Sequence, residues 1–433
     1  MKATSVTTHN REQLASRLGR EKVQKDLIFA ESEKDVVQAI QWAKETGITL
    51  FPEGRGAFRT ETGEVPGIRL SLERMTGVVE HSAGDLTITV QPGVTLERLQ
   101  GVLQPHGQML PLDPPWQGVT TVGGAVALAR TGPKRLKNGQ VRDAVLGLRV
   151  ALASGKVIRT GGKVVKNVAG YDMNKLFVGS MGTLGAITEC TLKLRPVPAD
   201  QAVAGVAGKS WGELAVFARR LLDSPLEPSA VELVNGRVWE ELFGTDTSPC
   251  GLVVGFGDEV PAVQSQLDRL HNWGKEEGLH LEEERRGDEA AGIWKRLGRL
   301  TPHHLRPAMG RFTLKLKGIT LSTQTATLLE KGELSARKQE LRLFQWGGLG
   351  TGISHLVLQG HREQSEQAAE WVHALRRTVE EMQGYVVVEH ASDGLSSRID
   401  LWGRKPGGFS LMKNIKSALD PEGIFPPGRF GGM

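Results

Sequence analysis

Cysteine and long apolar runs are scarce in this sequence of 433 residues. The two cysteines, Cys190 and Cys250, form no C-x-x-C pair, so the chain cannot build a disulfide framework or a cysteine-ligated iron–sulfur cluster. This usage is typical of a reducing compartment. No run approaches the roughly 20 apolar residues that span a bilayer, and the N-terminus lacks the apolar core of a signal peptide. We therefore expect a cytoplasmic protein without an integral membrane segment, whose membrane association, if any, comes through partners.

Net charge is also small for this length. The 54 basic and 49 acidic residues leave a formal charge of +5. The basic residues are dispersed, so the excess favours anionic ligands, and we expect no nucleic-acid partner. A chain of this length is too long to fold around a single hydrophobic core, so we expect two or three domains. Glycine, in contrast, is abundant, with 54 residues, and its placement carries the functional signal.

A glycine-rich stretch from Thr160 to Pro198 organises the sequence. Gly179, Gly182 and Gly185 precede an alternating apolar run from Ile187 to Leu194. Because glycine permits positive φ and close backbone approach, such a turn before a buried strand can wrap its N–H groups around a phosphate or an extended cofactor. A tight structural turn before a strand has the same spacing. The spacing alone leaves both interpretations open.

A second glycine turn follows the short strand predicted at Ile48 to Phe51. The sequence P-E-G-R-G-A-F-R runs from Pro52 to Arg59, so two glycines flank an arginine directly after the strand. Exposed N–H groups and a guanidinium suit a pyrophosphate. The loop is neither a G-x-G-x-x-G fingerprint nor a P-loop. A surface turn is the alternative interpretation.

Local patterns predict the elements around these turns. Ser32 and Asp35 form a capping box for a helix that ends at Gly47. An alternating strand is predicted at Leu86 to Val90, and Thr95 is the expected N-cap of the next helix. Further signals are a small-residue helix opened by Gly123 and Gly124, and a hairpin turn at Ser154-Gly155.

The motifs of residues 25–198 occur in a fixed order. They are P-E-G-R-G, V-Q-P-G-V-T-L-E-R-L, M-L-P-L-D-P, T-V-G-G, V-L-G-L-R-V-A-L-A-S-G-K-V, G-Y-D-M-N-K-L-F-V-G-S-M-G-T-L-G and I-T-E-C-T-L-K-L-R-P-V-P. This series resembles the FAD-binding domain of the vanillyl-alcohol oxidase and para-cresol methylhydroxylase (PCMH) type. Within that family, K-N-V-A-G-Y-D and Q-W-G-G are most similar to the FAD-binding subunit of bacterial glycolate oxidase.

The resemblance implies an α+β protein. It has a PCMH-type FAD-binding domain of two subdomains at 20–198, an antiparallel-sheet α+β cap domain at 199–409, and a segment at 410–433 that returns to the FAD domain. The sequence agrees, because apolar strand-like runs beyond residue 200 alternate with amphipathic helices. Examples are the runs at 252–256, 312–316 and 385–388 and the helices at 212–222 and 365–382. A last helix is expected at 409–419.

The resemblance also implies which residues line the FAD. They are Pro52, Gly54, Arg55, Gly56, Asp113, Pro114, Thr121, Val122, Gly123, Gly124, Gly179, Gly182, Thr183, Leu184, Gly185 and Ile187. Some relatives tether the flavin through a histidine or cysteine near the first glycine loop, where this chain has Ala57 and Phe58. We therefore expect noncovalent FAD. In the tail that returns to the FAD domain, relatives commonly have Asn-Pro-Gly, where this chain has Pro426, Pro427 and Gly428, so a side-chain hydrogen bond from that asparagine to the flavin is absent.

The cap motif departs from its relatives. Related metal-dependent 2-hydroxy acid dehydrogenases carry H-x-G-D-G-N-x-H and a later E-H-G. Here the first element ends at His355 but has Gly348 and Thr351 in place of its first histidine and its aspartate. Because one of three protein ligands is missing beside His355 and Glu389, we expect no catalytic metal. His390, in the second element, is the candidate base. The alternative is that both histidines are structural.

A carboxylate substrate needs a cationic partner, for which the planar fork of arginine is suited. The segment with Trp294, Arg296 and Arg299 resembles a Trp–Arg helix of the family cap, although a solvated basic helix face is an alternative. The resemblance thus implies an FAD-dependent subunit of a 2-hydroxy acid (glycolate) oxidase complex. A paralogous flavin subunit and an iron–sulfur subunit would be its partners. The alternative function is a non-catalytic flavin relay beside a catalytic paralogue.

Overall fold

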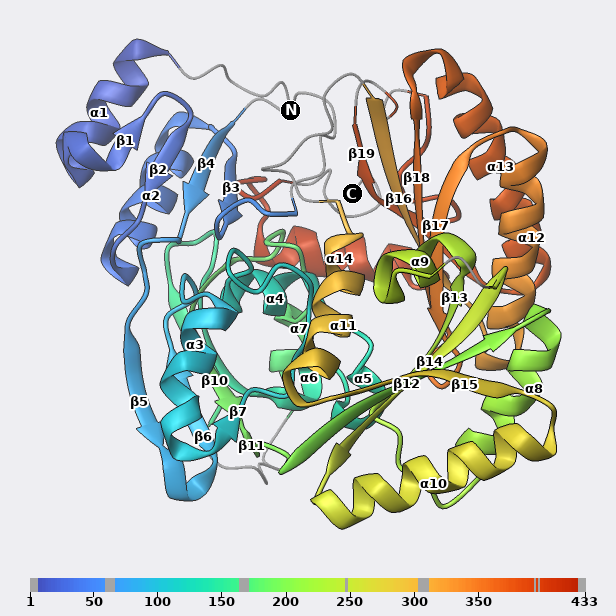
Figure 1. Cartoon of the computed structure of the whole chain (residues 1–433). Helices are drawn as coiled ribbons and strands as arrows, with labels where there is room; N and C mark the ends of the chain where they lie inside the picture. The colour runs from blue at the N-terminus through green and yellow to red at the C-terminus, as the bar shows by residue number, and fades with distance from the viewer. Residues whose placement is uncertain are drawn as a thin grey trace.

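The computed structural model describes residues 7–58, 67–162, 171–245, 248–302, 311–392, 395 and 398–426. Within these residues the chain forms two parts that lie side by side (Figure 1). The N-terminal part contains sheets of four, five and two strands, and the C-terminal part, called the cap below, contains one sheet of eight strands.

The first subdomain of the N-terminal part is a four-stranded sheet with two helices. Its strand order is β1-β2-β4-β3, and the β2–β4 and β4–β3 pairs are parallel. The elements are α1 (Thr8–Leu18), β1 (Val23–Gln24), β2 (Leu27–Phe29), α2 (Glu33–Thr46), β3 (Leu50–Glu53) and β4 (Ile68–Ser71). The predicted capping box of α2 is confirmed, since Ser32 and Asp35 exchange both hydrogen bonds and Gly47 ends the helix at φ +67°.

The second subdomain is an antiparallel sheet of order β5-β6-β10-β8-β9. Its strands are β5 (Val78–Ser82), β6 (Thr87–Val90), β8 (Val145–Ala151), β9 (Val157–Gly161) and β10 (Ala186–Lys193), and β7 (Gln108–Met109) pairs with β11 (Arg195–Pro196). Its helices are α3 (Leu96–Leu103), α4 (Val122–Leu128), α5 (Arg135–Asn138), α6 (Val141–Ala144) and α7 (Asn174–Phe177). The predicted cap Thr95 and the β8–β9 hairpin are confirmed, and the structure adds Thr121 as the N-cap of α4.

The cap sheet is antiparallel throughout, as the alternating strands and helices predicted. Its order is β15-β12-β14-β13-β17-β18-β16-β19. The strands are β12 (Asp200–Gly208), β13 (Ala230–Asn235), β14 (Cys250–Asp258), β15 (His280–Arg286), β16 (Arg311–Ile319), β17 (Arg342–Gly348), β18 (Ile353–His361) and β19 (Tyr385–Ala391).

Helices cover the two faces of the cap sheet unequally. On the outer face lie α8 (Trp211–Leu222), α10 (Val260–Glu276), α12 (Thr325–Lys338) and α13 (Ser365–Glu381). On the face toward the N-terminal part lie α9 (Gly236–Phe243) and α11 (Gly287–Arg299) (Figure 1). The predicted apolar stripe of α13 is confirmed, because Ala368, Trp371, Val372, Leu375 and Val379 are all buried. Short 3-10 turns lie at Arg20–Lys22, Ala83–Asp85, Gln104–His106, Ser322–Gln324 and Arg362–Gln364.

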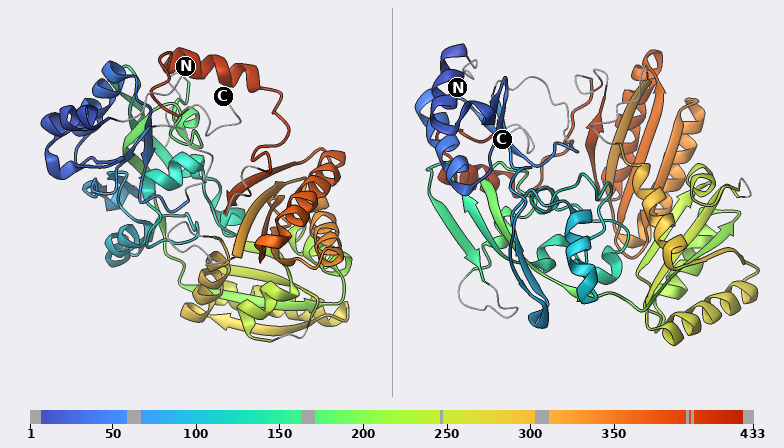
Figure 2. Two further views of the ribbon diagram at one scale, coloured as in Figure 1. Left: turned by 90° about the horizontal axis from the view of Figure 1, so that it is seen from above. Right: turned by 60° about the vertical axis from the view of Figure 1, so that its left-hand side comes forward.

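The last helix, α14 (Phe409–Leu419), leads the chain from the cap back to the N-terminal part (Figure 2). The buried ammonium of Lys416 donates to the carbonyl oxygen of Thr183 at 2.8 Å and forms an ion pair with Asp420. Farther along, the N–H of Leu50 donates to the carbonyl oxygen of Ile424 at 2.7 Å. The tail therefore holds both the strand before the first glycine loop and the glycine turn before β10.

Candidate functional site

The structure brings the predicted glycine turns together. A Cβ atom at Gly54 would collide with the side chain of Thr121, and one at Gly182 would lie 3.5 Å from Pro52. The N–H of Gly179 donates to the carbonyl oxygen of Val126 in α4 at 3.0 Å. Three segments that are far apart in the sequence therefore meet at one place, and the missing side chains allow this approach.

Backbone donors at these turns suit a pyrophosphate. The N–H groups of Gly54, Arg55, Gly56 and Gly182 form no hydrogen bond with any residue that the structure describes. Gly182 is buried and has φ +73°. Buried N–H groups are normally paired, so an unpaired one beside a second loop of free donors is a place for an anion. These donors fit the FAD pyrophosphate that the sequence predicts here.

The turn at α4 differs, because its amides are already used. The N–H groups of Val122 and Gly123 donate to the carbonyl oxygens of Val94 and Pro92, and the N–H of Gly124 donates to Thr121 Oγ1. This turn packs closely against its neighbours but has no free N–H at those three residues. Of the remaining predicted residues, Leu184, Gly185 and Ile187 are buried at the start of β10.

Asp113 shapes a loop of the N-terminal part. Its carboxylate accepts hydrogen bonds from the N–H groups of Gly132 at 2.9 Å and Lys134 at 2.8 Å. A Cβ at Gly132 would collide with the carbonyl oxygen of Asp113. Asp113 thereby fixes the segment that runs from α4 into α5, and this segment carries Arg130 and Arg135.

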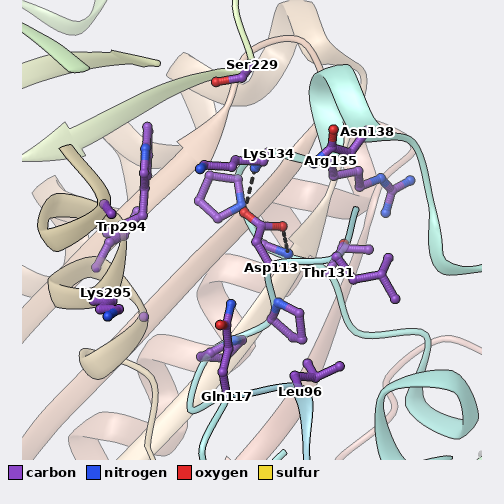
Figure 3. Close-up of a pocket in the computed structure, with 18 of the residues that line it drawn as sticks. Leu96, Asp113, Gln117, Thr131, Lys134, Arg135, Asn138, Ser229, Trp294 and Lys295 are labelled. Atoms are coloured by element: carbon purple, nitrogen blue, oxygen red, sulfur yellow. Dashed lines mark hydrogen bonds between the residues drawn. The ribbon is translucent and has the colours of Figure 1, made fainter. Parts of the chain in front are cut away.

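A cavity of about 1800 Å³ lies between the N-terminal part and the cap. It exceeds the roughly 300–1,000 Å³ of a typical small-molecule site. Asp113 and Pro114 line it, whereas the glycines at 54, 56 and 182 do not. Figure 3 shows Trp294 and Lys295 of α11 on one side and Lys134 and Arg135 on the other. Arg55 lies apart, in a depression of about 310 Å³ with Arg74 and Arg98.

The cap contributes a cationic floor to this cavity. Strand alternation turns Leu314 and Leu316 of β16 into the core beneath α12 and α13, whereas Lys315 and Lys317 line the cavity. The Lys315 ammonium, on a side chain only 3% exposed, lies 2.8 Å from Glu389 Oε2. Glu389 occupies an irregularity in the β16–β19 pairing, of the kind that redirects a side chain next to active sites.

The N-terminal part adds a second cation to the same carboxylate. Arg130 Nη1 lies 3.5 Å from Glu389 Oε2, and its guanidinium stacks 4.0 Å from the ring centroid of Phe58. Burial opposes ionisation of Glu389, but Lys315, Arg130 and Lys317 outweigh it and hold its pKa well below the usual range. Burial lowers the pKa of Lys315 to about 8, partly offset by Glu389.

His355 lies beside this charge cluster. It is the β18 neighbour of Lys317, and its ring centroid is 5.2 Å from that of Trp346. Burial, reinforced by Lys315, holds the pKa of His355 well below its usual value, so the imidazole is neutral at neutral pH. Its Nδ1 atom is buried and has no hydrogen-bond partner in the described part of the chain.

Space at Gly348 is already filled. A Cβ there would collide with Thr351 Oγ1 and lie 2.9 Å from Glu232 Oε1. Burial and the charge of Asp113 raise the pKa of Glu232 well above its usual value. A histidine at 348 therefore does not fit among the present neighbours. Among the residues that the structure describes, no three His, Cys, Asp or Glu side chains are grouped closely enough to hold a metal ion.

The remaining candidates are scattered. His390 is half-buried opposite Lys315 and does not line the cavity, although Glu389 does. Arg299 and Trp294 line the cavity, whereas Arg296 Nε donates to the carbonyl oxygen of Leu242 at 3.0 Å. The K-N-V-A-G portion of one quoted motif, at 166–170, and residues Pro427 and Gly428 lie outside the described residues.

Sequence reasoning missed Arg130, Lys315 and Lys317. A signal existed for the lysines, because the alternation L-K-L-K within an apolar run places both on one face of a strand. Arg130 gave no such signal, since its partner Glu389 is 259 positions away.

Known proteins share this architecture. Residues 25–161 match the family described as "FAD binding domain", and residues 197–430 match "FAD linked oxidases, C-terminal domain". The solved structure of p-cresol methylhydroxylase with substrate bound has a TM-score of 0.75 and 15% identity, covering 99% of this chain and 98% of that one. The predicted PCMH-type α+β fold is confirmed. No described helix is long and apolar enough to cross a bilayer.

Curated relatives include two glycolate oxidase subunits. GlcD of Bacillus subtilis is 28% identical over 439 residues, which cover 93% of this chain and 88% of that protein. GlcE of Escherichia coli is 44% identical over 135 residues, 31% of this chain and 39% of that protein. The predicted resemblance and the predicted FAD cofactor are thereby confirmed. Since the C-terminal match alone spans just over half of its residues, the chain belongs to the family of FAD-linked oxidases.

Proposed function

We propose that this protein is the FAD-binding subunit of a complex that oxidises a small 2-hydroxy acid, with glycolate as the first candidate. The observation that carries the proposal is the cationic floor formed by Lys315, Lys317 and Arg130 where the cap faces the FAD-binding domain. A 2-hydroxy acid presents a carboxylate, and such a floor attracts it. The names of the two glycolate oxidase relatives support the same substrate class.

The residues of this chain have separable tasks in that reaction. FAD, when bound, supplies the acceptor for the electrons of the substrate. The cations hold the carboxylate, and an unprotonated imidazole accepts the hydroxyl proton. His355 lines the cavity and is neutral at neutral pH, so it joins His390 as a candidate base. Lys315 and Arg130 keep Glu389 ionised between them.

Electrons then have to leave the chain. Cys190 and Cys250 are both buried and are the only cysteines, so an iron–sulfur cluster has to come from a partner. We propose an iron–sulfur subunit and a paralogous flavin subunit as the partners. The match to both GlcD and GlcE supports the second of these.

The second candidate function is a flavin relay without a substrate site of its own. The crowding at Gly348 favours it, because the cap cannot hold the histidine of its metal-dependent relatives there. In that case the paralogous subunit oxidises the acid, and this chain holds FAD for electron transfer or assembly.

Anaerobic flavin reduction separates the two functions. The purified chain is expected to release its flavin on acid precipitation, as noncovalent FAD does. Glycolate or D-lactate should then bleach the flavin of the isolated chain, and replacing the active base by alanine should slow bleaching by about 10²- to 10⁴-fold. His355→Ala and His390→Ala identify the base, and His373→Ala on the exposed face of α13 is the control. Flavin that stays oxidised until a partner is added supports the relay.

A further inference from the structure

Two cations in the cavity lack a protein partner. Lys317 of β16 and Arg135 of α5 line the cavity, and neither side chain forms a hydrogen bond or ion pair with a residue that the structure describes. Other cations nearby are paired, as Lys137 is with Asp258 at 3.0 Å. A partly buried cation without a counter-ion costs free energy, so the pair calls for an explanation.

Charge accumulates at this wall. Burial, reinforced by Arg130 and Arg135, lowers the pKa of Lys317, and Glu389 offsets only part of that effect. Burial and the charge of Arg142 also lower the pKa of Arg135, and the charge of Asp143 offsets only part of that effect. The cations come from both parts of the molecule, since Arg130 and Arg135 lie in the N-terminal part and Lys317 lies in the cap. Neither Arg135 nor Lys317 is therefore neutralised by an ion pair with a described acidic residue.

In the described part of the chain, no acidic group that lines the cavity forms an ion pair with Lys317 or Arg135. Glu389 is shared by Lys315 and Arg130. The oxygens of Asp113 accept the N–H groups of Gly132 and Lys134. Glu232, whose pKa is raised by burial and by the charge of Asp113, lies against Gly348. The other carboxyl groups that line the cavity belong to Glu97, Glu227, Asp258, Glu259 and Asp288, and none of them forms an ion pair with Lys317 or Arg135 in the described part of the chain. A bound anion can supply the charge that these two cations lack.

We propose that Arg130, Arg135 and Lys317 form an anion site between the two parts of the molecule, and that its ligand is the carboxylate of a small organic acid. The guanidinium groups and the ammonium group donate to the carboxylate oxygens, and the bound anion bridges the N-terminal part and the cap. The identity of the acid rests on the proposed function, since a 2-hydroxy acid is such a carboxylate. The anion site itself rests on the unpartnered cations. Phosphate shares this charge chemistry, so the test compares both anions.

Oxalate is a suitable probe, because it carries carboxylates and cannot be oxidised as a 2-hydroxy acid is. Calorimetric titration of the full-length, FAD-loaded protein with oxalate in the presence of EDTA should show binding. Lys317→Met and Arg135→Gln should each weaken it by about tenfold, the usual scale for a lost charged hydrogen bond. Lys295→Met, on the α11 side of the cavity, should not. Flavin content and circular dichroism establish that each variant is loaded and folded.

Several results would overturn the site. Oxalate affinity that is unchanged in both variants, or binding that disappears with EDTA, contradicts it. Loss of FAD from the folded variants shows that the cations serve the cofactor instead. Inorganic phosphate that binds as tightly as oxalate contradicts the choice of a carboxylate. If oxalate binds at the anion site but no 2-hydroxy acid reduces the flavin, even with partners, the proposed function is wrong and the anion site is retained. If glycolate bleaches the flavin but oxalate binding does not depend on the anion site, the anion site is wrong and the proposed function is retained.

Discussion

We infer that the glycine turns and the cap floor each bind negative charge, but through different kinds of donor. At the glycine turns the donors are backbone N–H groups of the loop at 54–56 and of Gly182. At the cap floor they are the side chains of Lys315 and Lys317, joined by Arg130 of the N-terminal part. Backbone amides do not titrate and are positioned by φ and ψ, whereas ammonium groups titrate and are positioned by packing. The first region should therefore be sensitive to backbone strain and the second to pH and charge.

Strain at Gly182 is expected to have the largest effect. Gly182 has φ +73°, which a β-branched residue adopts only with about 1–3 kcal/mol of strain. Gly182→Val should lower FAD affinity by at least tenfold, because relief of the strain at φ +73° moves the backbone N–H that we expect to face the pyrophosphate. The measurement is flavin content and FAD titration of the apoprotein, with circular dichroism to show folding.

Gly244→Val is the matched control. Gly244 ends α9 at φ +79° and has no atom within 4 Å of an added Cβ. It therefore carries similar backbone strain in the cap, away from the glycine turns. Normal flavin content in folded Gly182→Val, or equal flavin loss in both variants, would remove the turn at 182 from the FAD site.

The glycine turns could be predicted from the sequence because each is local. Gly54, Gly56 and Gly182 are needed where the backbone approaches a neighbour or turns to positive φ, and the motifs around them recur in order. Thr95 was predicted as a cap for the same reason, since a cap is decided within three residues. The motif at α4 does not show that the N–H groups of Val122 and Gly123 are already hydrogen-bonded, because their acceptors are the carbonyl oxygens of Val94 and Pro92, which lie outside it.

The cap floor could not be predicted in the same way. Glu389 meets Lys315 through strand pairing and Arg130 through docking of the two parts, and no local pattern encodes either contact. The motif comparison drew attention to Gly348 as a missing ligand, while the structure shows that Thr351 and Glu232 fill its place. Which charged residues far apart in the sequence become neighbours depends on the order of the strands in the sheet and on how the two parts dock, and no local sequence pattern shows either.

Titration should separate the two regions. The pKa of Lys315 is about 8, with Glu389, Arg130, Lys317 and His355 around it. As the pH rises through about 8 the ammonium loses its charge, so the cluster becomes less positive. Oxalate affinity should then fall roughly three- to tenfold between pH 7 and pH 9, the scale of one screened charge at short range. FAD affinity, which depends on backbone donors, should stay constant over the same range.

Lys315→Arg tests the assignment of that titration. Arginine keeps its charge throughout this range, so the fall in oxalate affinity should move to higher pH. Isothermal titration at matched ionic strength measures both proteins. A fall with the same midpoint in the variant, or a parallel fall in FAD affinity, would contradict the contrast between the two regions.

The smallest expected effect is that of replacing Glu232, because burial disfavours the ionised form of its carboxyl group. Its pKa is raised well above 4.5, so the folded chain holds a proton that the unfolded chain releases as the pH rises above that value. Stability from this group is therefore complete at low pH and decreases as the pH rises toward the pKa of the folded state.

Glu232→Gln replaces the carboxyl group by a neutral group of similar shape and should raise Tm by a few °C near pH 8. The gain should vanish near pH 4. Exposed Glu240→Gln should change Tm at neither pH; a gain for Glu232→Gln that is equal at both pH values would show that the side chain acts through packing and not through its proton.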